Sequence, residues 1–249
     1  MDIDTIFENI IVLKISKDSS NKFSLSELEE LSNILNIEIE ELAINVLKIN
    51  QRFLYDLKKG NQNNVISREY RIRKQEFLEA HREEMIGSII IKKISEDFSA
   101  GFTLNEIKEY SNKLNVNLDD LCINVLKLSQ NATCSLKSGA FKRLYSEGYK
   151  IVKQKYLETV RDKILEKIML EKMQTDFTSI FTYEEIEKYS KKFNINTRDL
   201  LGNVLNISNY GKWNKPILKE TKFNSGIYRI FKHNYMQIKG NEILDSFLL

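Results

Sequence analysis

Three short segments of this 249-residue chain combine amide, hydroxyl and cationic side chains, which can hydrogen-bond to base edges in the DNA major groove. Each segment lies 79 residues after the one before it. The candidate reading residues are Gln51, Arg52, Tyr55, Lys58 and Lys59, then Gln130, Asn131, Ser135 and Lys137, and then Asn209, Lys212, Asn214 and Lys215. Because the three sets differ in side chain, we expect either three different subsites or one dominant reader with two helpers.

More Lys and Arg residues follow each segment, and cations of this kind bind the phosphates of a nucleic acid. We expect this role for Arg68, Arg71, Arg73 and Lys74, for Lys142, Arg143, Lys150 and Lys153, and for Lys222, Arg229 and Lys232. Residues 50–82 contain eight Lys and Arg against four Asp and Glu, residues 129–161 seven against two, and residues 208–240 seven against one. The formal net charge of +3 therefore conceals three basic segments in an otherwise acidic chain, which favours a nucleic acid partner.

The spacing of these segments is part of an internal repeat. Phe23, Phe102 and Phe181 are each 79 residues apart, and so are the triplets Asn-Val-Leu that begin at Asn45, Asn124 and Asn203. The sequence therefore predicts three tandem helical repeats, over residues 1–79, 80–158 and 159–249, the last with a C-terminal tail. One Pro and nine Gly are too few for the turns of a β-rich protein, so we expect an all-α fold.

Helix boundaries can be read at the same places in each repeat. Ser24 with Glu27, Thr103 with Glu106, and Thr182 with Glu185 have the spacing of a capping box. The helices that these boxes begin are expected to end at Asn36, Asn115 and Asn194, because Asn tolerates the left-handed conformation. A second helix and a short third helix follow, and the third ends at Gly60 or Gly139 in the first two repeats. A long helix, continuous or kinked, is predicted over residues 67–98 and 146–177.

The second and third helices carry a resemblance to a known family. The segment DDLCINVLKLSQNATCSLKSGAFKR (residues 119–143) resembles the helix-turn-helix of phage-repressor-like (Xre-like) regulators, and LAINVLKINQRFLYDLKKG (residues 42–60) matches it in the first repeat. The resemblance covers about 25 residues in each repeat. It departs from the family at the turn, where Lys48, Lys127 and Asn206 replace a small residue, often Gly, and at Pro216, which interrupts the third reading helix.

A second register of the same motif is also possible. The segment EIKEYSNKLNVNLDDLCINVL fits the pattern with Ser111 at the small position and Asn115 at the turn. Its reading helix in the first repeat would begin Glu38-Ile39-Glu40-Glu41, and these carboxylates would repel phosphates. We therefore expect this helix to belong to the scaffold.

The resemblance implies a sequence-specific, double-stranded DNA-binding protein that contacts a long or directly repeated site through three helix-turn-helix elements. Transcriptional regulation, or control of a plasmid or mobile element, is the expected role. The rival interpretation is a helical-repeat adaptor that binds proteins without nucleic acid. RNA binding is a further alternative, although recurrent aromatic residues on which bases could stack are missing.

The chain lacks the residues that other classes of function require. The two Cys and two His do not have the spacing of a closed zinc site, and no nucleotide-binding or hydrolase motif is present. We therefore expect no enzyme, no cofactor and no metal. The sequence shows neither a secretory signal nor a stretch suited to a membrane span, and its low Cys content is typical of a cytoplasmic protein. Its abundant Ile, Lys and Asn indicate an AT-rich coding genome, so we expect a bacterial protein.

Overall fold

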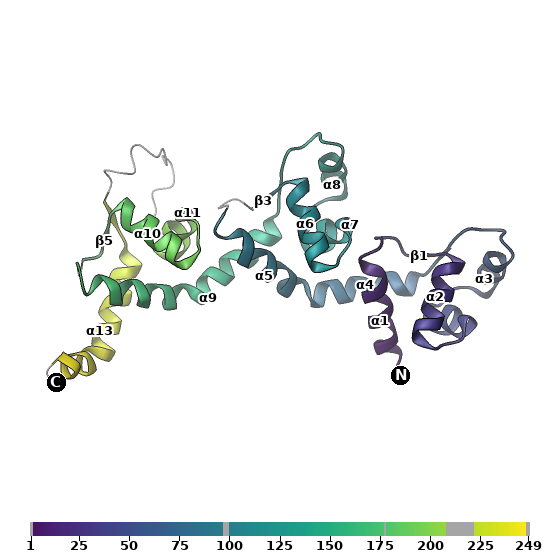
Figure 1. Cartoon of the computed structure of the whole chain (residues 1–249), viewed down its shortest axis with the longest axis horizontal. Helices are drawn as coiled ribbons and strands as arrows, with labels where there is room; N and C mark the ends of the chain where they lie inside the picture. Colours follow the sequence, from purple (N-terminus) through teal and green to yellow (C-terminus); the bar gives the residue numbers. More distant parts are fainter. Residues whose placement is uncertain (1, 97–99, 177, 208–221, 248–249) are drawn as a thin grey trace. The chain divides into compact units, whose positions relative to one another are not determined.

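The computed structural model describes residues 2–96, 100–176, 178–207 and 222–247, the last eight of them as backbone only. The chain is mainly helical, which confirms the predicted class, and short two-stranded sheets accompany the helices (Figure 1). It divides into two compact units, which are described separately: unit 1 is Met1–Ile86 with Gly101–Gly148, and unit 2 is Gly87–Ala100 with Tyr149–Leu249. The repeat boundaries expected at residues 79 and 158 fall within helices and stay a prediction.

Unit 1 contains two runs of elements in the same order. The first run comprises α1 (Ile3–Ile15), β1 (Lys22–Phe23), α2 (Leu25–Leu35), the π-helix η1 (Glu41–Val46), α3 (Gln51–Lys58), β2 (Val65–Ile66) and α4 (Arg68–Ala80). The second comprises the start of α5 (Arg82–Lys93), then β3 (Gly101–Phe102), α6 (Leu104–Leu114), α7 (Leu118–Asp120), the π-helix η2 (Leu121–Val125), α8 (Gln130–Lys137), β4 (Leu144–Tyr145) and the start of α9 (Glu147–Lys172).

Unit 2 begins with the remainder of α5 and of α9. Its other described elements are β5 (Ile180–Phe181), α10 (Tyr183–Phe193), α11 (Thr197–Asp199), the π-helix η3 (Leu200–Val204), β6 (Phe223–Asn224) and α13 (Gly226–Phe247). Among the described residues of both units, none of the helices has the length and apolar composition that a membrane span needs.

The helices α2, α6 and α10 begin and end where the sequence predicts. All three predicted capping boxes are formed, and in α2 the Ser24 Oγ accepts from the Glu27 N–H while the Glu27 carboxylate accepts from the Ser24 N–H. The three helices end at Asn36, Asn115 and Asn194, each with φ of 53°. Asn at a left-handed position satisfies the last carbonyls of the helix, so these predictions are confirmed.

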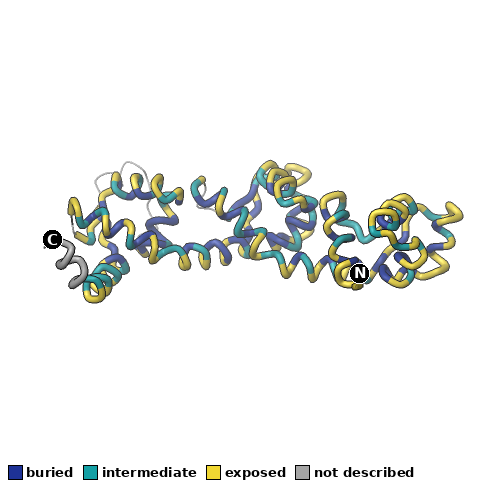
Figure 2. Tube along the Cα trace, turned by 60° about the horizontal axis from the view of Figure 1, so that its bottom comes forward, coloured by how far each residue is buried: buried dark blue, intermediate teal, exposed yellow. Residues whose placement is uncertain are grey.

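The core lies on the apolar faces of these helices. Figure 2 shows buried and exposed residues alternating along the chain, as amphipathic helices require. Phe23 and Leu28, which flank the first capping box, are both fully buried, and the Phe23 ring meets Tyr70 edge-on at 5.1 Å between ring centres. Phe181 and Tyr228 repeat this contact in unit 2, also at 5.1 Å.

The two-stranded sheets were not predicted. Each pairs a strand before a capped helix with a strand after the short third helix, as in β1 with β2, where Lys22 lies opposite Ile66 and Phe23 opposite Val65. The pairings β3 with β4 and β5 with β6 are also antiparallel. A strand of two residues is too short to show the alternation by which strands are recognised in a sequence.

A buried serine fixes the element that follows each sheet. The Ser67 hydroxyl donates to the Leu47 carbonyl at 2.6 Å, Ser146 donates to Leu126 at 2.5 Å, and Ser225 donates to Leu205 at 2.7 Å. In each case the acceptor lies directly after a π-helix. The bond therefore ties the end of the second helix of the motif to the start of the long helix.

The long helices differ between their two complete copies. In the first copy the helix is interrupted at His81, where α4 ends and α5 begins, and the His81 ring lies 4.2 Å from the Phe77 ring with its Nδ1 2.9 Å from the Phe77 carbonyl. In the second copy Val160 takes the place of His81, and α9 runs without interruption for 26 residues. Both of the predicted alternatives, kinked and continuous, therefore occur.

Candidate nucleic-acid interface

Two short helices, α3 and α8, carry the first two sets of predicted reading residues. Each has eight residues and begins at a side-chain cap, because Asn50 accepts from the Arg52 N–H at 2.9 Å and Ser129 accepts from the Ala132 N–H at 3.2 Å. Gly60 and Gly139 follow the helices with φ of 74° and 80°. The predicted glycine stops are thus confirmed, since glycine adopts this conformation without steric cost.

The turn before each short helix contains a residue in the left-handed region. The φ angle is 52° at Lys48, 55° at Lys127 and 48° at Asn206. These are the positions where the sequence departs from the helix-turn-helix family by lacking a small residue. A lysine adopts this conformation at a cost of about 1–2 kcal/mol, whereas glycine adopts it freely. The backbone of the turn therefore has a conformation that suits glycine, although the residue type differs.

The apolar and polar sides of α3 and α8 are sharply divided. Leu54 and Leu57 are each 3% exposed and hold α3 to the core, while Thr133 and Leu136 are buried on α8. The opposite sides carry the reading candidates. Gln51, Arg52, Tyr55, Lys58, Lys59, Gln130, Asn131 and Lys137 are exposed, and Ser135 is half-buried.

The third set of reading candidates, Asn209, Lys212, Asn214 and Lys215, lies outside the described residues. All of the expected phosphate-binding residues are described, and the exposed ones are Arg68, Arg71, Lys142, Arg143, Lys150, Lys222 and Arg229.

Lys153 is a correction to the predicted phosphate-binding set. It is 4% exposed, and its Nζ donates to Asp199 Oδ2 at 3.0 Å in a buried ion pair. Burial raises the pKa of Asp199, although the Lys153 ammonium and the amides of Asn196 and Asn203 oppose this rise. Lys74 makes the equivalent pair with Asp120, also at 3.0 Å. Neither lysine can reach a phosphate, because each neutralises a carboxylate inside the protein.

Arg73 is also engaged within the protein. Its guanidinium lies 3.1 Å from Asp4 and 3.3 Å from Glu69, and it stacks over the Phe7 ring at 5.5 Å. We therefore remove Arg73 from the expected phosphate contacts. Lys232 is half-buried and has a partner of its own, so it is removed as well.

Two carboxylates at this surface were missed. The Lys58 ammonium, in the last turn of α3, donates to Glu40, and the Lys137 ammonium, in the last turn of α8, donates to Asp119. The sequence alone places Glu40 in the scaffold, because its carboxylate repels phosphates. A sequence signal for these ion pairs exists, because each acid stands 18 residues before its lysine in both copies.

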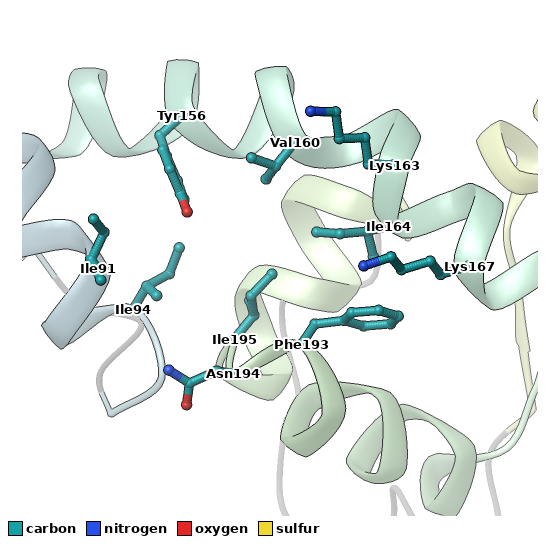
Figure 3. Close-up of a pocket in the computed structure, with 10 residues that line it drawn as sticks. All are labelled: Ile91, Ile94, Tyr156, Val160, Lys163, Ile164, Lys167, Phe193, Asn194 and Ile195. Atoms are coloured by element: carbon teal, nitrogen blue, oxygen red, sulfur yellow. The ribbon is translucent and has the colours of Figure 1, made fainter.

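The described surface also contains an apolar pocket of about 280 Å³ in unit 2 (Figure 3). Ile91 of α5 and Ile94, which follows that helix, face Tyr156, Val160 and Ile164 of α9. Phe193, the last residue of α10, and Ile195 beyond it close the pocket, with Asn194, Lys163 and Lys167 beside them. None of these lining residues is a Ser, Cys, His or carboxylate.

Metal-ligating side chains are not clustered in the part of the chain that the structure describes, where no group of three or more His, Cys, Asp or Glu could hold an ion. Cys122 is buried in the core, and burial raises the pKa of its thiol to about 11. Cys134 is exposed on α8.

Comparison of the chain with protein-family models, curated proteins and solved structures finds no match. The helix-turn-helix interpretation therefore rests on the residues and geometry of this chain alone.

Proposed function

We propose that this protein binds double-stranded DNA through helix-turn-helix-like elements, one in each of three tandem copies of a 79-residue helical unit. The observation that carries the proposal is the recurrence of one arrangement in α3 and α8. In both, a short capped helix follows a left-handed turn residue, buries two side chains and exposes Gln, Asn or Arg. Such side chains can read bases in the major groove.

The charge of the segments that follow α3 and α8 supports this function. Exposed Arg68, Arg71, Lys142 and Arg143 follow α3 and α8 along the chain, and clustered cations supply most of the sequence-independent affinity for DNA. We propose a regulatory role in transcription or on a plasmid or mobile element, without catalysis, cofactor or metal, in the cytoplasm. The apolar pocket of unit 2 favours the rival function, a helical-repeat adaptor for a protein partner.

A matched pair of charge-removing variants tests the proposal. The variant R52A/K59A removes two cations from the exposed side of α3, and we expect at least about tenfold weaker binding to the DNA upstream of the protein's own gene, since lost base and phosphate contacts each contribute about 1–3 kcal/mol. The control K108A/K113A removes two exposed cations from α6 and should leave the affinity within about twofold. Equal affinities of R52A/K59A and the wild type would show that α3 is not the reading helix.

A further inference from the structure

The lysine nearest the end of each described reading helix is bound to a carboxylate of the preceding helix. Lys58 pairs with Glu40, the residue before η1, and Lys137 pairs with Asp119 in α7. The two pairs are 79 residues apart at both partners, so two separate copies of the unit place the same pair at the same point of the reading surface.

The third copy replaces both partners together. Arg198 stands at the position of Glu40 and Asp119, and Pro216 stands at the position of Lys58 and Lys137. Where the lysine is missing, the carboxylate is missing too, and a cation takes its place. This joint replacement indicates that the acid and the lysine act as one pair rather than as two independent surface residues.

Stability does not account for these pairs. The side chains of Lys58 and Glu40 are 35% and 58% exposed, and those of Lys137 and Asp119 are 41% and 37% exposed. Ion pairs in such a position contribute little to folding because water screens them. Their effect on the reading surface is larger, since each pair cancels one cation and places one carboxylate where a polyanion would approach.

We propose that Glu40 and Asp119 are specificity-determining residues that hold Lys58 and Lys137 in internal ion pairs and so lower the affinity for DNA of arbitrary sequence. This inference rests on the proposed DNA-binding function. Discrimination between DNA sites is a difference of affinities, and suppressing the sequence-independent part of binding increases that difference. A carboxylate at a reading surface also repels phosphates but can accept a hydrogen bond from cytosine N4.

The test measures binding of the full chain to a random-sequence duplex and to its own upstream DNA by fluorescence anisotropy over a salt series. In E40Q/D119N the two lysines are released, so we expect tighter binding to the random duplex and a log–log salt slope steeper by about two, one for each new phosphate contact. The control E30Q breaks the exposed pair of Lys17 with Glu30 on another part of the chain, and it should not alter the slope.

A second variant shows whether the released lysines cause the gain. Adding K58A/K137A to E40Q/D119N should abolish the extra affinity and the extra slope. Persistence of the gain without the lysines would overturn the proposal, because it would arise from the lost acidic repulsion alone. Unchanged binding of E40Q/D119N to the random duplex would also overturn it. A wild-type protein that binds neither duplex at low salt would instead refute the DNA-binding function itself, and the inference with it.

Discussion

Buried lysines are the residues whose role differs most from what their type suggests. Lys153 and Lys74 each form an ion pair with a carboxylate that is 5% exposed or less, and amide side chains donate to the remaining oxygen atoms, as when Asn203 donates to Asp199 at 2.6 Å. A buried charge without its partner is far costlier than the pair. These lysines therefore belong to the interior of their units rather than to the proposed DNA-binding surface.

Removal of one such lysine should destabilise the protein strongly. We expect K153A to lower the free energy of unfolding by about 3 kcal/mol, because Asp199 would be left buried without its counterion. The control K163A removes an exposed lysine from the same helix and should change it by less than about 0.5 kcal/mol. Urea unfolding followed by circular dichroism measures both, and equal stabilities of the two variants would contradict the buried pair.

The ion pairs of another buried lysine, Lys14, make the stability of the protein depend on pH. Lys14 Nζ lies 2.7 Å from Glu27 and 3.0 Å from Asp18. Burial raises the pKa of both carboxyls. The hydrogen bonds and positive charge of Lys14 outweigh this effect, together with hydrogen bonds from Ser20 to Asp18 and from Ser24 to Glu27, and hold each pKa below its ordinary value. The stabilisation is therefore complete above the ordinary values of 3.8 and 4.5 and disappears as the pH falls through the lower folded-state pKa values.

We expect the urea midpoint of the wild type to fall on acidification below about pH 4.5, and the fall to be shallower in K14M/E27Q. In that variant Glu27 no longer titrates and Asp18 has lost its counterion. Midpoints measured from pH 6 to pH 3, at constant ionic strength, follow the change. If the urea midpoint of the variant falls with pH as steeply as that of the wild type, other carboxyls govern the acid unfolding.

At the scale of elements, the turn before α3 is one described part of the fold with an identifiable backbone strain. Lys48 has φ of 52°, a conformation that is unfavourable for a residue with a Cβ. The variant K48G should raise the free energy of unfolding by about 0.5 kcal/mol, because the relief of strain exceeds the added chain entropy of glycine. K108G in the middle of α6 should lower it by about 1 kcal/mol. Destabilisation by K48G, measured by thermal unfolding, would contradict the left-handed turn.

The sequence was sufficient for elements that local chemistry decides. Ser24 with Glu27 and the terminal Asn36 defined a helix without reference to the rest of the fold. The pairing of Lys22 with Ile66 and the burial of Lys153 against Asp199 depend on partners distant in the chain, which local patterns do not reveal. The recurrence of Lys74 and Lys153 at one position did carry a signal, but surface phosphate binding explained it equally well.

At the scale of the whole molecule, both units use the same internal joint. The amide side chain and the N–H of Asn117 donate to the Ile15 carbonyl at 2.8 Å each, and Asn196 donates in the same way to the Ile94 carbonyl at 2.7 and 2.8 Å. Each joint lies within its own unit and fixes the end of a helix against the N-cap residue of α7 or α11.

The salt dependence of binding to the DNA upstream of the protein's own gene is the measurement that tests the central claim most directly. A protein that places about six cations on phosphates should lose about 1,000-fold in affinity between about 50 and 200 mM salt, with a straight log–log plot. Gel shifts across that series are therefore expected to show tight binding at the low end and a steep linear decline. An absence of binding at low salt, or an affinity that does not change with salt, would contradict the account.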